Sequence, residues 1–274
     1  MRLGISSSLN EPDAGKWAER MSKMGCKSVV FPLDCSAGKD RVKEFTKAAK
    51  ENDLLIAEVG IWRNVLASSK EERKTNFEYA VGQLRLADEI GAKCCVNVAG
   101  AFGDRWDGGH RANFTKEAWN ETVQSVRAII DEVKPKNTKF AIESMPWMYP
   151  TGPEEYKRLM EDVEREEFAA HLDVINMVNC PKRYFFFDEF LEECFDILGE
   201  SIVSCHLKNS LLLEGYTFQL KECALEEGRL NVTKYVELAH KLDKDMPMII
   251  EHLADDEAYA VSMKYALEKF ENYL

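Results

Sequence analysis

Four residues of types that bind divalent metal ions stand at the ends of four short apolar runs. Glu143 ends FAIE, Asp173 ends AAHLD, His206 follows VSC, and Glu251 follows PMII. An ionised carboxylate at the end of a buried strand is costly unless an opposite charge compensates it. Three carboxylates and one imidazole suit a hard or borderline cation such as Mn²⁺, Mg²⁺ or Co²⁺, with Zn²⁺ as a further candidate. We therefore expect one divalent cation to be held by these four side chains.

The runs that carry these residues belong to a regular alternation of apolar and amphipathic segments. Predicted strands cover 2–6, 27–31, 54–59, 93–98, 139–143, 168–173, 201–207 and 248–252. Predicted helices cover 13–24, 39–51, 71–90, 116–132, 153–164, 187–199, 232–242 and 255–271. Strict alternation of strand and helix implies a parallel sheet, and eight repeats in about 250 residues have the size of a TIM barrel. The prediction is one (β/α)8 barrel domain over residues 1–274.

A doubly wound open sheet is the competing fold, and it usually has a glycine-rich phosphate loop after its first strand. That place holds SSSLNEPDAG, which contains neither G-x-G-x-x-G nor a P-loop. In a TIM barrel the active site lies at the C-terminal ends of the strands. The four metal-binding candidates end the fifth to eighth predicted strands, so the barrel would bring them together. Taken singly, each would more often be an ordinary strand-end residue.

Neighbouring residues are placed by the alternation of side chains along a strand. Lys208 shares the side of His206 and is expected to lean towards the site. His171 shares the side of Asp173 one layer deeper, where we expect a hydrogen-bonded interior histidine. His252 is expected to face away from the barrel axis, against a helix.

The substrate face of such a barrel is formed by the loops that follow the strands. Trp62, Trp106 and Trp147 all lie in such loops. Tryptophan rings stack on sugar rings, and they also pack loops together, so both interpretations stay open. Glu58, near the end of the third strand, is either a substrate contact or an ordinary strand-end acid.

Charge and composition argue against some classes of binding partner. The formal charge is −12 and no cluster of Lys and Arg is visible, which argues against nucleic acid. No apolar stretch reaches the length of a membrane span, and the N-terminus lacks a signal-peptide layout, so we expect a cytoplasmic protein without a membrane partner. None of the eight cysteines forms a C-x-x-C pair. Cys94, Cys95 and Cys205 lie inside predicted strands and are expected to be buried thiols in a reducing compartment.

The segments AIES, HLDVIN, CHLKN, PMIIEH and LADEIGAKCCVNVAG resemble the xylose isomerase-like TIM barrels, the broad sugar phosphate isomerase/epimerase family. This resemblance covers the whole chain. The family includes ketose 3-epimerases, hydroxypyruvate isomerase, inosose dehydratase and endonuclease-four-like enzymes. The resemblance implies a divalent metal on the four residues named first. It also implies that Glu143 and Glu251 act as proton-transfer groups, as in the epimerase branch.

The sequence departs from the epimerase pattern at substrate-contact positions. Asn176 stands where many epimerases have a histidine, Leu212 where they often have an arginine, and Tyr149 where they often have a glutamate. HLKN looks like the HLKD of other branches, including dehydratase-like ones, in which the lysine helps to bind or act on a substrate, so the resemblance gives Lys208 a catalytic role. Lys208 and Asn176 lie two and three residues beyond candidate ligands, so both are expected to shape substrate choice. The endonuclease branch needs several more histidines than the five present here.

The chemistry that this donor set supports is α-proton transfer on a hydroxy-ketone, with a divalent cation stabilising the enediolate. The leading hypothesis is a metal-dependent sugar or keto-sugar isomerase or epimerase. One alternative is a metal-dependent lyase or dehydratase acting on a keto-sugar or keto-inositol, including a subunit of a deglycosylating enzyme. Another is a non-catalytic carbohydrate-binding barrel. The expected partner is a small sugar or polyol derivative, and a homo-oligomer is left open.

Overall fold

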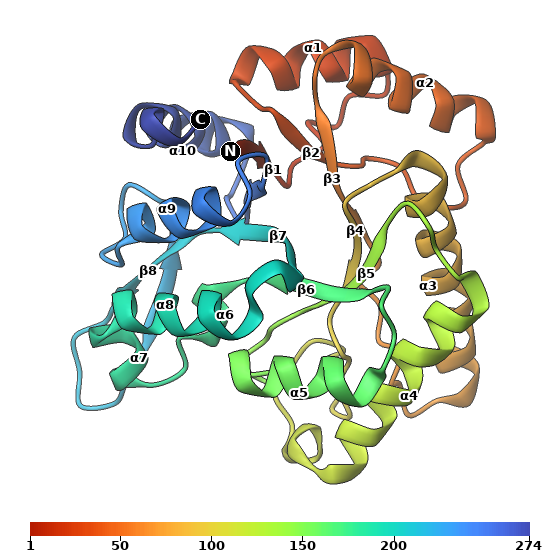
Figure 1. Cartoon of the computed structure of the whole chain (residues 1–274), viewed down its shortest axis with the longest axis vertical. Helices are drawn as coiled ribbons and strands as arrows, with labels where there is room; N and C mark the ends of the chain where they lie inside the picture. The colour runs from red at the N-terminus through yellow and green to blue at the C-terminus, as the bar shows by residue number, and fades with distance from the viewer.

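The computed structural model describes residues 1–274 and contains a ring of eight parallel strands with the helices outside it (Figure 1). The barrel strands are β1 (Arg2–Ile5), β2 (Ser28–Val30), β3 (Leu55–Gly60), β4 (Cys94–Asn97), β5 (Lys139–Glu143), β6 (Phe168–Leu172), β7 (Ile202–Leu207) and β10 (Pro247–Ile250). Their order in the sheet is β1-β10-β7-β6-β5-β4-β3-β2. The backbone N–H of Lys27 donates to the Leu3 carbonyl at 2.7 Å, which links the two edge strands. The predicted TIM barrel is confirmed.

Eight longer helices alternate with these strands, as predicted: α1 (Ala14–Met24), α2 (Lys39–Glu51), α3 (Lys70–Ile90), α4 (Lys116–Val133), α5 (Pro153–Val163), α8 (Phe187–Leu198), α9 (Val232–Leu242) and α10 (Asp256–Lys269). Five of them have a side-chain cap on the first turn, supplied by Asp13, Ser69, Thr115, Asn231 and Asp255. None of the helices is both long enough and apolar enough to cross a membrane.

Two segments contain structure that the sequence did not predict. The stretch after β7, expected to be a loop, forms an antiparallel hairpin of β8 (Asn209–Leu212) and β9 (Leu220–Cys223). Short helices α6 (Val174–Met177) and α7 (Pro181–Phe185) precede α8. Both insertions leave from the C-terminal ends of barrel strands, so they add walls on the side where the site is expected.

The interior of the barrel is divided between apolar and polar side chains. Cys94, Val96 and Ala141 form a small apolar cluster from β4 and β5. Glu58 of β3 and Ser204 of β7 lie buried within hydrogen-bond distance of each other. TIM barrels usually fill this space with bulky branched residues, so buried polar residues here indicate a site rather than a packing layer. Cys95 and Cys205 are buried as predicted, and all eight cysteines are free thiols.

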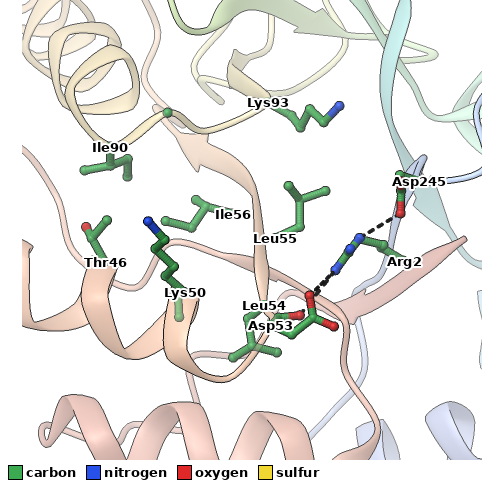
Figure 2. Close-up of a pocket in the computed structure, with 12 residues that line it drawn as sticks. Arg2, Thr46, Lys50, Asp53, Leu54, Leu55, Ile56, Ile90, Lys93 and Asp245 are labelled. Carbon is green, nitrogen blue, oxygen red and sulfur yellow. Dashed lines mark hydrogen bonds and ion pairs between the residues drawn. The ribbon is translucent and has the colours of Figure 1, made fainter.

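A hollow of about 450 Å³ lies at the opposite, N-terminal end of the strands (Figure 2). There the guanidinium of Arg2 bonds to Asp53 and to Asp245, each at 3.0 Å. These bonds join the start of β1 to the segments before β3 and β10. In TIM barrels the N-terminal end of the strands contributes to stability, and the C-terminal end carries the active site.

Candidate metal centre

The four side chains that the strand ends predicted as metal ligands converge at the C-terminal end of the barrel. One ligand atom from each of Glu143, Asp173, His206 and Glu251 lies within 4.8 Å of those of the other three. The Nδ1 atom of His206 is 3.0 Å from Glu251 Oε2 and 3.3 Å from Glu143 Oε1. It is 3.7 Å from Asp173 Oδ2. All four side chains are buried.

The strands place these side chains by simple alternation. Glu143 is the last residue of β5, and Asp173 and Glu251 directly follow β6 and β10. Ser204, His206 and Lys208 occupy alternate positions along β7 and just beyond it, so all three point into the barrel.

Lys208 is buried against the acids, as its position after His206 predicted. Its Nζ atom lies 2.7 Å from Asp173 Oδ2 and 2.7 Å from Glu251 Oε1. A third carboxylate, that of Glu222, lies 3.3 Å away. Such a cation offsets part of the negative charge that the buried acids bring together.

Asn176 lies beside the acids on α6. Its side-chain amide donates to Glu143 Oε1 at 3.0 Å. Its backbone N–H donates to Asp173 Oδ1 at 3.1 Å, so Asp173 caps the short helix that carries Asn176. Asn176 therefore orients two of the four candidate ligands.

Glu58 lies one layer deeper and contacts protein groups on both carboxylate oxygens. Ser204 Oγ donates to its Oε1 at 2.9 Å, and His206 Nε2 lies 3.4 Å from its Oε2. A carboxylate behind a metal-binding histidine fixes the ring and its tautomer. With Nε2 directed at Glu58, Nδ1 is the nitrogen that faces the acids.

His171 is interior, as predicted, but the expectation that its ring is hydrogen-bonded is wrong. Neither ring nitrogen has a hydrogen-bond partner, and its Nδ1 lies 3.6 Å from Glu58 Oε1. The ring instead packs edge-on against His206, with centroids 4.2 Å apart. Burial, followed by the nearby His206, lowers the pKa of His171 to about 4, so this ring is neutral at neutral pH.

The expectation that His252 faces away from the barrel is wrong. β10 ends at Ile250, and His252 has a left-handed backbone with φ of 59°. The strand alternation therefore stops before His252, and its ring turns towards the cavity with 59% of the side chain exposed. Its Nδ1 lies 2.8 Å from Glu222 Oε1 on β9, and its Nε2 lies 3.5 Å from Glu251 Oε2.

The charged groups in the cluster shift one another's pKa values. Burial raises the pKa of Glu143 to about 7, and the nearby Glu251 and Asp173 add to this rise. Burial would lower the pKa of His206, but Glu251, Glu58 and Glu143 raise it well above its usual value. Burial would raise the pKa of Glu58, but His171 and His206 bring it down to about 2. In the absence of a metal ion, a protonated His206 therefore neutralises part of the negative charge of the carboxylates.

A cavity of about 1050 Å³ opens from this cluster. Glu58, Glu143, His206 and Glu251 lie at its inner end. Trp62, Trp106 and Trp147 line it as well, which places all three predicted tryptophans on one cavity. The hairpin β8–β9 contributes further lining residues, among them Leu213, Phe218 and Glu222.

Glu222 and Ser204 were not identified from the sequence. Ser204 lies two residues before His206, so alternation along the strand is a signal that could have found it. Glu222 lies on a hairpin outside the barrel strands, where strand-end logic does not apply. Gly215 between the runs NSLLL and YTFQL is the available hairpin signal.

The residues fit a divalent cation. Three buried carboxylates and one imidazole nitrogen face a common point, at separations compatible with a small ion between them. Asp173 Oδ2 accepts no hydrogen bond, and its close contact is the charged amine of Lys208 at 2.7 Å. The oxygen-rich set differs from a closed zinc site made of cysteines.

The barrel and its acidic cluster define a TIM-barrel protein with a candidate metal centre. A family model described as xylose isomerase-like TIM barrel matches residues 18–269, and the chain belongs to that family. The resemblance predicted from the strand-end motifs is thus confirmed. A comparison with curated proteins gave no match.

Several solved structures share the fold at low sequence identity. A xylose isomerase-like TIM barrel protein from Mycobacterium smegmatis in complex with magnesium has 18% identity and a TM-score of 0.70, over 99% of this chain and 94% of that one. D-psicose 3-epimerase with D-tagatose from Clostridium cellulolyticum H10 has 14% identity and a TM-score of 0.72, over 100% and 99%. A probable 3-DHS dehydratase from Bacillus anthracis has 15% identity and a TM-score of 0.69, over 92% of each chain. At these identities the likeness shows the fold alone.

Proposed function

We propose that this protein is a divalent-metal-dependent isomerase or epimerase of a sugar or keto-sugar, acting by α-proton transfer. The observation that carries the proposal is the convergence of Glu143, Asp173, His206 and Glu251 at the inner end of one cavity. A bound cation would supply Lewis-acid polarisation of the substrate carbonyl, which acidifies the neighbouring C–H. Mn²⁺, Mg²⁺ and Co²⁺ are the preferred candidates, and one relative was solved with magnesium.

Glu143 and Glu251 are the proposed proton-transfer groups. They leave from β5 and β10, which are separated in the sheet by β6 and β7. His206 Nδ1 lies between their carboxylates, at 3.3 and 3.0 Å. A substrate seated over this point would present different faces to the two acids. One acid can then take the α-proton while the other returns one.

Other side chains are assigned to substrate selection. Asn176 lines the cavity beside Glu143, so it can contact a substrate bound there. The buried Lys208 donates to Glu251, so it can influence the substrate through that acid. Trp62 lies over His206 with ring centroids 6.5 Å apart, and its face can cover a sugar ring. The structural relatives that were solved with sugars support this substrate class.

Elimination is the second candidate, as a lyase or dehydratase on a keto-sugar or keto-inositol. Expulsion of a leaving group needs an acid besides the base that takes the α-proton. His252 lies 3.5 Å from Glu251 Oε2 and is exposed to the cavity, so it supplies such a group. The likeness to a probable dehydratase supports the same alternative.

The test is α-proton exchange in D₂O, followed by NMR, with the Mn²⁺-loaded protein and a panel of keto-sugars. We expect metal-dependent deuterium incorporation. Glu143→Gln and Glu251→Gln should each lower the rate by about 10²–10⁴-fold, the usual contribution of a general acid or base. Glu44→Gln, on the exposed face of α2, is the matched control.

The outcomes separate the candidate functions. A deuterated epimer or aldose–ketose isomer would support the proposal. A product that has lost water or a larger group would support elimination. Metal binding with no exchange on any keto-sugar would favour a non-catalytic carbohydrate-binding barrel.

A further inference from the structure

The cavity is larger than its acidic end requires. Its volume of about 1050 Å³ is slightly above the range of roughly 300–1,000 Å³ found for pockets that hold drug-sized ligands. Glu143, His206 and Glu251 gather at one end of it. A free monosaccharide held by these residues would leave much of the remaining space to water.

The part of the cavity away from the acids has large apolar side chains open to solvent. Trp106 is 38% exposed, Trp147 is 50% exposed and Leu213 is 41% exposed. They come from three separate segments, which are the loop after β4, the loop after β5 and the β8–β9 hairpin. Packing between loops would bury these side chains, so their exposure at a cavity wall indicates a surface for an apolar ligand.

The two tryptophan loops are tied to each other by Asn113. Its buried side-chain amide donates to the Gly108 carbonyl at 3.0 Å and to the Trp147 carbonyl at 2.9 Å. Its Oδ1 accepts from the Phe102 backbone N–H at 2.9 Å. One buried residue thereby fixes the backbones that present Trp106 and Trp147. The apolar wall is set in place before any ligand arrives, which lowers the entropic cost of binding.

We propose that this cavity binds a sugar that carries a flat apolar substituent, such as an aryl glycoside or its keto derivative. The sugar part lies at the acidic end, and the apolar group lies between the two tryptophan loops and the hairpin. This inference rests on the proposed function for the placement of the sugar. The location of the apolar group rests on the exposed wall alone.

The test compares the binding of matched methyl and phenyl glycosides of several hexoses to the Mn²⁺-loaded protein by calorimetry. For at least one hexose, we expect the phenyl glycoside to bind about tenfold or more tightly than the methyl glycoside, since stacking and apolar burial each contribute on the kcal scale. Trp147→Ala and Leu213→Ala should each reduce that preference while Mn²⁺ affinity stays the same. Phe185→Ala removes an aromatic residue that is 67% exposed and outside the cavity lining, and it should leave the preference unchanged.

Equal or undetectable binding of both glycosides for every hexose would overturn the inference. The same holds if the preference survives in both Trp147→Ala and Leu213→Ala, or is lost in Phe185→Ala. These outcomes are independent of the proposed function, which depends on α-proton exchange with simple keto-sugars. A protein that exchanges protons but shows no phenyl preference keeps the proposed function and loses this substrate class.

Discussion

The imidazole of His206 lies between two charged layers, with its Nε2 atom 3.4 Å from Glu58 Oε2 and its Nδ1 atom facing Glu143, Asp173 and Glu251. Glu58 comes from β3, which is separated from β7 in the sheet by β4, β5 and β6. A contact across the barrel interior thus sets the orientation of the only nitrogen ligand in the candidate centre.

Glu58→Gln is expected to weaken metal binding by about 10–100-fold, the usual effect of removing a partner behind a metal-binding histidine. The amide keeps the size of the side chain but removes the charge that holds Nε2–H. Metal affinity measured by competition with a fluorescent chelator provides the readout. Glu44→Gln, an exposed change of the same type, should bind metal normally. An unchanged affinity in Glu58→Gln would show that His206 does not depend on this contact.

His206→Ala is expected to remove most bound metal, because only the three acids would remain as ligands. Metal content after gel filtration, measured by mass spectrometry, tests this expectation. His240 lies on α9 outside the barrel strands, with its Nδ1 3.0 Å from the Tyr273 carbonyl oxygen. His240→Ala is therefore the histidine control, and normal metal content in His206→Ala would contradict the assignment.

Lys208→Met should have a larger effect on the metal-free protein than on the loaded one. Removing one partner of a buried ion pair typically costs about 3–5 kcal/mol, since the acids are left uncompensated. A bound cation would compensate Asp173 and Glu251 in place of Lys208. The difference between the melting temperatures in Mn²⁺ and in EDTA should therefore be larger for Lys208→Met than for the unmodified protein. Lys234→Met, which breaks the ion pair with Glu192 on the surface, should leave this difference in melting temperature unchanged.

Metal binding is expected to release protons, and the affinity should rise with pH. The raised pKa of His206 keeps this ring protonated in the metal-free protein at neutral pH, and Glu143 with a pKa of about 7 is partly protonated. Metal ligands must be deprotonated, so binding competes with these protons and weakens as pH falls. Calorimetry at pH 7 in two buffers of different ionisation enthalpy measures the number released. Identical heats in both buffers would contradict the expectation.

The barrel and the four converging side chains could be predicted because both follow from local rules. The apolar runs define the strands, and the last residue of each run falls at the active end. Lys208 followed from the same alternation. His252 could not be placed, because alternation fails once the backbone adopts a left-handed φ. Glu222 could not be placed either, because its position depends on how the hairpin folds back over the barrel.

The hairpin also separates the candidate metal ligands from part of the cavity wall, so that the wall can change in evolution without changing the ligands. The candidate ligands leave directly from barrel strands, whereas Leu213, Phe218 and Glu222 belong to a segment inserted after β7. Mutations in that segment can reshape the cavity wall while the barrel and its acids stay in register. Among homologues of this chain, the length and composition of this insertion are therefore expected to vary with ligand preference. Exchanging the segment between homologues should transfer that preference as a unit.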